Sequence, residues 1–503
     1  VTGVQTCALP ISRGLAAALA LNAGSMGVAN ATGGHGHGHG QSKPKIKNVI
    51  YLLGDGMGRT HVTAARERYY GADGKLNMEK FPAVGQVSTY AVQQASGQPG
   101  DADFAPNYVT DSASAATAWS SGVKTYNAAL GVDAKGNVVP TIMEYAKLAG
   151  LRTGNVSTAE ITDATPAGQM SHALLRGCQG PTYSDAACQN PALTGGANLP
   201  TTDVRVTPIA DQIARNNTAD VILGGGLSRF DAADESALEA NGYDVLGSPT
   251  SQTVATKSDL AGASSKKVFA LFNKGNMTIE KYKRENPASV QAQEPTVAEM
   301  TKKAIDLLKK GNSRGFYLQV EGALIDKRSH ANDAAQTLEE MKAFDEAVKV
   351  AYDFAKKDGH TLVIVTADHE CAGFNIIEKG TFTNAEATTP PANADSGNPA
   401  NNSTPSRPAG GTKDPVRSSG IINGAGSGDP ANFAPATFRT PDDPAGVVDG
   451  TPEASLWLTY LSGNHTGADV PVFAYGPDSD ELEGSIDNTD LFGIVGGALK
   501  IVH

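Results

Sequence analysis

Carboxylates and histidines stand directly after short apolar runs at several places in this sequence. Asp55 lies in the glycine-rich segment 54–58, which follows the apolar run 48–53, and Asp368 and His369 follow a second apolar run. Glycines let the backbone and an ion approach each other closely, and carboxylate and imidazole groups are ligands for zinc and for harder cations. A capped glycine turn or a salt-linked turn looks the same in sequence, so these segments predict a metal site only in combination.

A third cluster follows another apolar run. Glu321 comes directly after this run, and Asp326 and His330 follow with i, i+4 spacing, which places both on one side of a helical turn. They match two of the ligands that a catalytic zinc needs while it keeps one coordination position open. His465 would complete this set, although a single His in such a loop is also common as a structural residue.

Ser112 opens a segment of small residues that is typical of a helix start. A Ser at a helix N-terminus is usually only a cap for the backbone. Near metal ligands, however, a Ser alkoxide at that place is well positioned to receive a phosphoryl group. Arg176 would then bind two phosphoryl oxygens through its bidentate guanidinium group.

The elements that must position these residues alternate along the chain. Apolar runs predict strands at 48–53, 152–157, 219–223, 316–320 and 361–366. Three- and four-residue apolar spacing predicts a helix over 336–357, and a capping box at Thr296 and Glu299 predicts the start of another. We therefore expect an α/β fold, with a central, mainly parallel sheet, helices on both faces, and ligand sites beyond the carboxyl ends of the strands.

Composition and charge limit the partners. The chain has 503 residues, 40% of them hydrophobic and 19% charged, which is enough apolar material for a large core. Its net charge of -12 at pH 7 disfavours nucleic acid and anionic membrane surfaces as partners. An anionic substrate would therefore need local positive charge from metal ions or an arginine. Beyond the N-terminal region, the apolar runs are too short to span a bilayer.

The N-terminal region has the pattern of an export signal. Arg13 precedes the Ala- and Leu-rich run 15–23, and Ala29 and Ala31 supply the small residues of a signal peptidase site. We interpret residues 13–31 as a signal peptide and expect a periplasmic or secreted protein. A buried Ala-rich helix is the alternative.

We expect one catalytic domain over residues 47–503, because the candidate chemistry spans positions 55–465 and must converge in space. Residues 1–12 lack a starting Met and resemble translated sequencing-adapter sequence, so we interpret them as an artefact. Residues 32–46 contain alternating His and Gly and are interpreted as a linker, with metal collection as the alternative. The segment from about 379 to 451 is rich in Pro, Asn, Gly, Ser and Thr and is predicted to be a low-complexity surface insertion.

Cysteine usage gives one candidate pair. Cys178 and Cys188 are close together in a loop-like stretch and would pair in an oxidising compartment. Cys371 is left over, and Cys7 lies in the leader. Scattered thiols of this kind do not make a Cys-type zinc site, so we expect any metal to be held by His and carboxylates.

Taken together, these motifs resemble the alkaline phosphatase family, in particular its secreted bacterial members. The resemblance covers residues 47–499 and runs, in order, through Gly54-Asp55-Gly56-Met57-Gly58, Val109-Thr110-Asp111-Ser112-Ala113, Asp163-Ala164-Thr165-Pro166, Val320-Glu321-Gly322, Asp326-Lys327 with His330, Thr366-Ala367-Asp368-His369 and His465-Thr466-Gly467.

The resemblance implies hydrolysis of phosphate monoesters to alcohol and inorganic phosphate, for extracytoplasmic phosphate scavenging. It implies a phosphoserine on Ser112, Arg176 as the phosphoryl clamp, two zinc ions and one magnesium ion. Asp163 and Lys327 match a bacterial pair that supports magnesium and contacts phosphate through water. Small phosphate monoesters are the expected partners, and a homodimer is compatible with the resemblance. The implied ligands are Asp326, His330 and His465 for the first zinc, Asp55, Asp368 and His369 for the second, and Asp55, Thr165 and Glu321 for magnesium.

This chain departs from the family in two features. Many relatives carry a His where this chain has Cys371, which bears on the tuning of the first zinc. The bacterial relatives also have a second disulfide, for which this chain lacks the cysteines.

Other activities compete with a phosphomonoesterase. A sulfatase, phosphodiesterase or phosphoglycerate mutase on a related metal scaffold is one alternative, but Ser112 lacks the C/S-x-P-x-R setting that a sulfatase needs. A protein that only binds metal or phosphate is the other, and it would be indicated by a missing nucleophile. Both Ser112 and Arg176 are present.

Overall fold

The computed structural model describes residues 45–380, 398–399 and 436–502. The predicted signal peptide, the residues interpreted as an artefact, nearly all of the linker and most of the predicted insertion lie outside the described residues.

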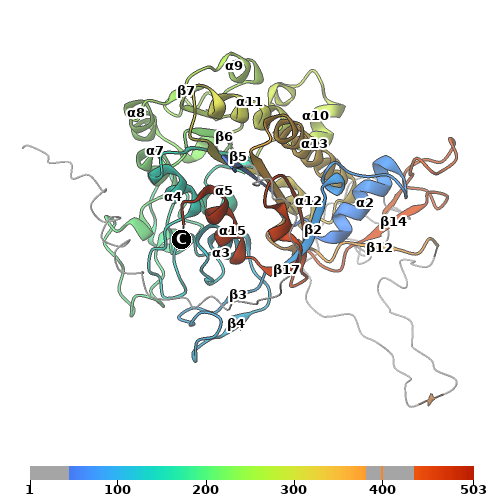
Figure 1. Ribbon diagram of the computed structural model, residues 1–503, viewed down its shortest axis with the longest axis horizontal. Helices are drawn as coiled ribbons and strands as arrows, with labels where there is room; N and C mark the ends of the chain where they lie inside the picture. Colours follow the sequence, from blue (N-terminus) through green and yellow to red (C-terminus); the bar gives the residue numbers. More distant parts are fainter. Residues whose placement is uncertain (1–44, 381–397, 400–435, 503) are drawn as a thin grey trace, which may run out of the picture. The chain divides into compact units, whose positions relative to one another are not determined.

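The helices (Figure 1) are α2 Arg59–Tyr70, α3 Ser112–Ser121, α4 Ile142–Leu148, α5 Ala164–Ala167, α6 Asp185–Cys188, α7 Ile209–Asn216, α8 Ala232–Ala240, α9 Lys257–Gly262, α10 Glu280–Glu285, α11 Val297–Lys309, α12 Leu324–His330, α13 Ala334–Asp358 and α15 Asp490–Leu499. The strands are β1 Asn48–Gly54, β2 Ala83–Ser88, β3 Ala91–Val92, β4 Pro106–Asn107, β5 Arg152–Glu160, β6 Val221–Gly225, β7 Asp244–Leu246, β8 Val268–Leu271, β9 Phe316–Gly322, β10 Thr361–Thr366, β11 Glu370–Cys371, β12 Asn375–Ile377, β13 Ala436–Phe438, β14 Leu456–Thr459, β15 His465–Thr466, β16 Val470–Tyr475 and β17 Gly484–Asp487.

A ten-stranded sheet forms the centre of the described chain, in the order β17-β2-β16-β10-β1-β9-β5-β6-β8-β7. From β10 to β7, all neighbouring strands are parallel. Strand β16 runs antiparallel to both β10 and β2, while β17 pairs with β2 in parallel. The prediction of a mainly parallel sheet is therefore confirmed, with one antiparallel strand that the apolar pattern did not indicate.

Helices cover both faces of this sheet. Helix α11 packs on β5, β6 and β9, and α13 packs on β1, β9 and β10. On the other side, α4 and α5 contact β5 and β9, and α15 contacts β1 and α3. Figure 1 shows α11 and α13 across the sheet from α3, α5 and α15. The chain thus has the layered α/β arrangement that was expected.

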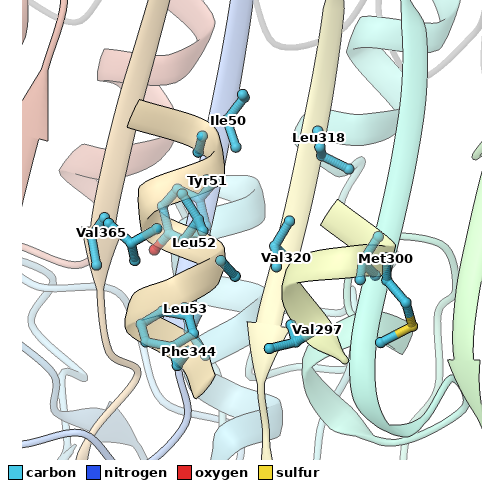
Figure 2. Packing of buried hydrophobic residues seen from close by; sticks show 14 of the residues in the cluster. Ile50, Tyr51, Leu52, Leu53, Val297, Met300, Leu318, Val320, Phe344 and Val365 are labelled. Atoms are coloured by element: carbon cyan, nitrogen blue, oxygen red, sulfur yellow. The ribbon is translucent and has the colours of Figure 1, made fainter. Parts of the chain in front are cut away.

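The central strands are buried on both faces, which explains why their sequences are continuous apolar runs rather than alternating ones. Every residue of β1 and of β10 is buried. Figure 2 shows Phe344 of α13 and Val297 of α11 packed near Leu53 of β1 and Val320 of β9. A Cβ on Gly322 would lie 2.8 Å from Phe344 Cδ2, so the packing of α13 on this strand end requires glycine.

The elements predicted from the sequence are present, with small shifts of their ends. The predicted strands correspond to β1, β5, β6, β9 and β10, and the helix predicted over 336–357 is α13. The capping box at the start of α11 is also present. Thr296 Oγ1 accepts from Glu299 N at 3.1 Å, and the Glu299 carboxylate accepts from Thr296 N at 2.9 Å.

The last part of the predicted insertion contributes to the core. Strand β13 pairs with β14, which also pairs with β12. Ala436 and Phe438 are each 3% exposed. The prediction assigned the whole segment from about 379 to 451 to the surface, but a three-residue strand has too few apolar positions to show a period.

The irregular segment after α5 carries a disulfide. Cys178 and Cys188 are bonded to each other, and both are buried in a small apolar cluster with Tyr126 and Val206. This cluster anchors a stretch that contains little regular structure. Among the residues that the structure describes, no helix combines the length and the apolarity that a membrane crossing requires.

Candidate active site

The candidate ligands gather at the carboxyl ends of three neighbouring strands. Asp55 directly follows β1, Glu321 lies at the end of β9, and Asp368 comes two residues after β10. Strand β1 lies between the other two, with Leu53 opposite both Glu321 and Thr366. Because parallel strands end at the same edge of the sheet, the segments that follow them meet there.

The residues predicted to hold the first zinc lie together. His330 Nε2 is 3.2 Å from Asp326 Oδ2 and 3.1 Å from His465 Nε2. The Nδ1 atoms point at backbone carbonyls, 2.7 Å from Gly463 O for His330 and 3.0 Å from Thr110 O for His465. A carbonyl only accepts, so each Nδ1 carries the hydrogen and each neutral ring presents a lone pair at Nε2. Two such lone pairs facing each other beside a carboxylate favour a cation between them.

The residues predicted to hold the second zinc form a separate group. His369 Nε2 lies 3.1 Å from Asp368 Oδ2 and 3.6 Å from Asp55 Oδ1. All these side chains are buried, and Gly56 N donates to Asp368 Oδ1 at 3.0 Å. Burial raises the pKa of Asp55 well above its ordinary value, and the Asp368 carboxylate raises it further. Ionised carboxylates at such a place need a positive charge beside them.

Unpartnered oxygens in both groups fit divalent metal ions. Among the described residues, Asp55 Oδ1, Asp326 Oδ1 and Asp368 Oδ2 are buried without a hydrogen-bond partner. An unpaired buried charge is costly, whereas coordination to a cation satisfies it. Within each group, one ligand atom per residue lies within 4.8 Å of the others. Carboxylate oxygen with imidazole nitrogen is the donor set of catalytic zinc sites.

The residues predicted to hold magnesium come from β9, α5 and the loop after β1. Glu321 is buried and accepts a hydrogen bond from Ser157 Oγ. Burial raises the pKa of Glu321 to about 7. Thr165 is buried in α5, and its hydroxyl has no partner within the described part of the chain. Together with Asp55, these oxygen donors suit a hard cation.

Ser112 begins α3 but does not cap it. The N-cap is Asp111, whose Oδ1 accepts from Ser114 N at 2.9 Å. The Ser112 hydroxyl lies instead 3.1 Å from His369 Nε2. The alternative in which Ser112 serves only as a helix cap is therefore wrong, because its hydroxyl faces the second group.

Two carboxylates hold Arg176. Its Nη1 lies 3.1 Å from Asp111 Oδ2 and its Nη2 lies 2.7 Å from Asp163 Oδ1. Asp163 Oδ2 also accepts from Lys327 Nζ at 2.7 Å. Burial raises the pKa of Asp163, but Lys327 and Arg176 outweigh it, so the pKa lies well below its ordinary value. The Arg176 side chain is 30% exposed, which leaves the guanidinium within reach of a ligand.

Sequence reasoning missed the ladder that joins the two groups. Strand β11 pairs with β15, with Glu370 opposite Thr466 and Cys371 opposite His465. The buried Glu370 carboxylate accepts from Thr466 Oγ1 and from Gly373 N, the latter at 3.1 Å. Two-residue strands have no period that could reveal them. The ladder places His465 beside the segment that carries the second group.

Sequence reasoning also left Cys371 out of the metal sites. Its Sγ and the ligand atoms of Asp326, His330 and His465 lie within 4.8 Å of one another. The expectation that only His and carboxylates surround the metal therefore overlooked a thiol. The one signal in the sequence was the place of Cys371, two residues after the predicted ligand His369.

Known proteins share the sequence of this chain over most of its length. The family model described as alkaline phosphatase matches residues 46–404. The alkaline phosphatase of Escherichia fergusonii is 37% identical over 482 residues, covering 90% of this chain and 86% of the relative. The streptomycin-6-phosphate phosphatase of Streptomyces griseus is 34% identical over 483 residues, covering 90% of this chain and 91% of the relative.

Solved structures share the fold. The alkaline phosphatase from the Antarctic bacterium TAB5 has a TM-score of 0.59 at 27% identity, covering 91% of this chain and 99% of the other. That of Thermus thermophilus has a TM-score of 0.62 at 23% identity, covering 94% and 96%. With the matches of sequence and the clustered carboxylates and histidines, these findings show that the chain belongs to the alkaline phosphatase family of metal-dependent phosphoric monoester hydrolases.

Proposed function

We propose that this enzyme hydrolyses phosphate monoesters through a covalent phosphoserine on Ser112 and serves to scavenge phosphate outside the cytoplasm. The observation that carries the proposal is the position of the Ser112 hydroxyl, 3.1 Å from His369 Nε2 at the N-terminus of α3. The backbone N–H groups of a helix N-terminus favour an anionic group. Arg176 lies next to this helix start, because Asp111 holds both.

The proposal assigns two zinc ions and one magnesium ion to the groups described above. When bound, these ions supply Lewis acidity, which lowers the pKa of the attacking hydroxyl and offsets the charge on the phosphoryl group. The proposed ligands are Asp326, His330 and His465 for the first zinc, Asp55, Asp368 and His369 for the second, and Asp55, Thr165 and Glu321 for magnesium.

The proposed reaction has two displacements at phosphorus. Ser112 Oγ attacks in line with the leaving oxygen, so that the Oγ–P bond forms while the bond to the alcohol oxygen breaks and the alcohol departs with a proton. Water then attacks the phosphoserine from the vacated side, the Oγ–P bond breaks, and inorganic phosphate and free Ser112 result. Arg176 donates to two phosphoryl oxygens in both steps, from the orientation that Asp111 and Asp163 impose.

Export of the enzyme is part of the proposal. The Cys178–Cys188 disulfide supports it, because such bonds form and persist in oxidising compartments. Bacterial alkaline phosphatases among the relatives give further support. N-terminal sequencing of the exported protein tests the proposed signal peptide at residues 13–31, with cleavage after Ala31 as the expected result.

Acid-quench trapping tests the nucleophile. The enzyme is mixed with a monoester labelled in its phosphoryl group, quenched in acid and digested, and the labelled peptide is identified. Label should appear on Ser112 and should be absent from Ser112→Ala, which should lose most turnover while it keeps its metal content. The matched control is Ser121→Ala at the other end of the same helix, where the hydroxyl donates to Thr117 O and lies far along the helix from Ser112. Label on another residue, or undiminished turnover in Ser112→Ala, would remove the mechanism.

A further inference from the structure

Cys371 lies in the first metal group, although it is not among the ligands proposed for that group above. The side chain is fully buried, and the thiol takes no part in a disulfide. Its Sγ and one ligand atom each of Asp326, His330 and His465 lie within 4.8 Å of one another. A soft donor therefore stands among the nitrogen and oxygen donors.

The backbone fixes the side of the group from which Cys371 approaches. Cys371 N donates to Gly56 O at 3.1 Å, and Cys371 pairs with His465 across the β11–β15 ladder. Gly56 has a φ of +71, and a Cβ there would lie 2.8 Å from Cys371 Cβ and 2.9 Å from Asp326 Cβ. The glycine thus lets both side chains reach the same small space. The Cys371 thiol contacts Asp326 O at 3.7 Å.

Two independent observations indicate that a ligand belongs in this space. Asp326 Oδ1 is buried without a hydrogen-bond partner in the described chain, on a side chain that is only 7% exposed. The Nε2 atoms of His330 and His465 face each other at 3.1 Å while both Nδ1 atoms are committed to carbonyls. Neither observation involves the thiol itself.

We propose that Cys371 Sγ is the fourth protein ligand of the first metal site, in addition to Asp326, His330 and His465. This inference rests on the proposed function only for the assignment of that site. On binding, the S–H proton is released to solvent and the weak contact with Asp326 O is exchanged for a bond to the metal. The donor set becomes one sulfur, two nitrogens and one oxygen, which selects zinc and similar thiophilic ions over magnesium.

The geometry requires only a small adjustment. A tetrahedral zinc with bonds of about 2.0–2.3 Å has ligand atoms about 3.3–3.6 Å apart. The two Nε2 atoms are 3.1 Å apart, and Asp326 presents Oδ2 at 3.2 Å to His330 and Oδ1 at 3.6 Å to His465, so these distances are already near this range. The thiol, at no more than 4.8 Å from the others, must approach them by at most about 1.2–1.5 Å. With four protein ligands, the site would accept a substrate oxygen only by expanding to five ligands, as some catalytic zinc sites do in the transition state.

Cobalt substitution tests the inference without measuring activity. Metal-free full-length enzyme is loaded with Co²⁺, and its spectrum is recorded for wild type, Cys371→Ser and Cys371→Ala. A thiolate ligand gives an intense charge-transfer band in the near ultraviolet, whereas visible bands report Co²⁺ held by His and carboxylates. We expect the near-ultraviolet band in wild type and its loss in both variants, with the visible bands retained. The dissociation constant for Co²⁺ should rise by at least about tenfold in both variants. A tenfold loss of affinity is the smallest effect expected even when the lost residue only hydrogen-bonds to a metal ligand.

Controls separate this inference from the proposed function. The double variant Cys178→Ala with Cys188→Ala should keep the band, because these two cysteines are bonded to each other in a separate apolar cluster. Visible bands without a near-ultraviolet band in wild type would overturn the thiolate ligand and leave the metal site intact. Failure of wild type to bind Co²⁺ at all would overturn both. If the Cys371 variants do not fold, the wild-type spectrum alone decides the question.

Discussion

Removal of the Arg176 guanidinium should weaken phosphate binding more than it lowers the stability of the folded protein. Asp111 and Asp163 hold this group at 3.1 and 2.7 Å. In Arg176→Ala each carboxylate keeps another partner, Ala128 N for Asp111 and Lys327 for Asp163. The side chains of Arg176, Asp111 and Asp163 are 30%, 19% and 16% exposed, so with these remaining partners neither carboxylate is left buried and unpaired. The variant should therefore fold and keep its metals.

The catalytic cost follows from the lost hydrogen bonds. Each charge-assisted bond contributes about 1.5–3 kcal/mol, and each 1.36 kcal/mol corresponds to about tenfold in rate. Loss of one bond predicts a fall in kcat/KM of about tenfold or more, and loss of two predicts about a hundredfold or more. Arg176 touches phosphoryl oxygens in both ground and transition states, so much of this cost should appear as weaker binding.

The assay is steady-state hydrolysis of a chromogenic monoester, with competitive inhibition by inorganic phosphate, for wild type, Arg176→Ala and Arg176→Lys. KM and the inhibition constant for phosphate should rise together in Arg176→Ala. Arg176→Lys should lie between the other two, because it keeps the charge but loses the bidentate fork. A metal-loaded Arg176→Ala enzyme with kcat/KM within about threefold of wild type, or with unchanged phosphate inhibition, would refute the reasoning.

Other predictions concern metals, the disulfide and pH. Excess chelator should abolish hydrolysis and zinc plus magnesium should restore it, and full activity in chelator would contradict the metal assignment. Cys178→Ala with Cys188→Ala should lower the free energy of unfolding in urea by roughly 2–3 kcal/mol for a sequence separation of 10, and an unchanged midpoint would exclude a stabilising role. Burial lowers the pKa of His172, but Glu144 at 3.0 Å outweighs it and raises the pKa above the ordinary 6.5. The ion pair between protonated His172 and Glu144 therefore stabilises the folded protein fully below about pH 6.5. This stabilisation is lost as pH rises through the pKa of His172 in the folded protein. His172→Gln should thus lose more unfolding free energy at pH 6 than at pH 9, and equal losses would show that the charge of His172 is unimportant.

The parallel centre of the fold was predictable because strands that are buried on both faces have continuous apolar runs in their sequences. The antiparallel strand β16 was not. Pro471 interrupts its apolar pattern, and Pro within a run argues against a central strand. Its pairing with β10 and β2 follows from tertiary packing that no local pattern records.

The candidate site was predictable to the same extent. Asp55 and Asp368 stand next to strand ends and Asp326 lies in the helix that follows β9, and parallel strands bring such positions together. The surroundings of these residues were not predictable. Glu370 and Cys371 acquire their positions from a two-pair ladder whose partner strand lies far along the chain. The residues next to Glu370 and Cys371 in the sequence show no pattern that predicts this ladder.

The small sheet β12-β14-β13 has a consequence for how this protein tolerates change. Its outer strands end at Ile377 and begin at Ala436, and both are paired with β14, with Ile376 and Ala436 opposite the same residue, Leu458. Adjacent strands are about 4.8 Å apart, so the two ends of the intervening chain are held about 10 Å from each other. The entropic cost of joining two fixed ends grows only with the logarithm of the number of residues between them, by about 0.6 kcal/mol for each doubling. A change in the number of residues between Ile377 and Ala436 should therefore leave the pairing of β12 and β13 with β14 in place.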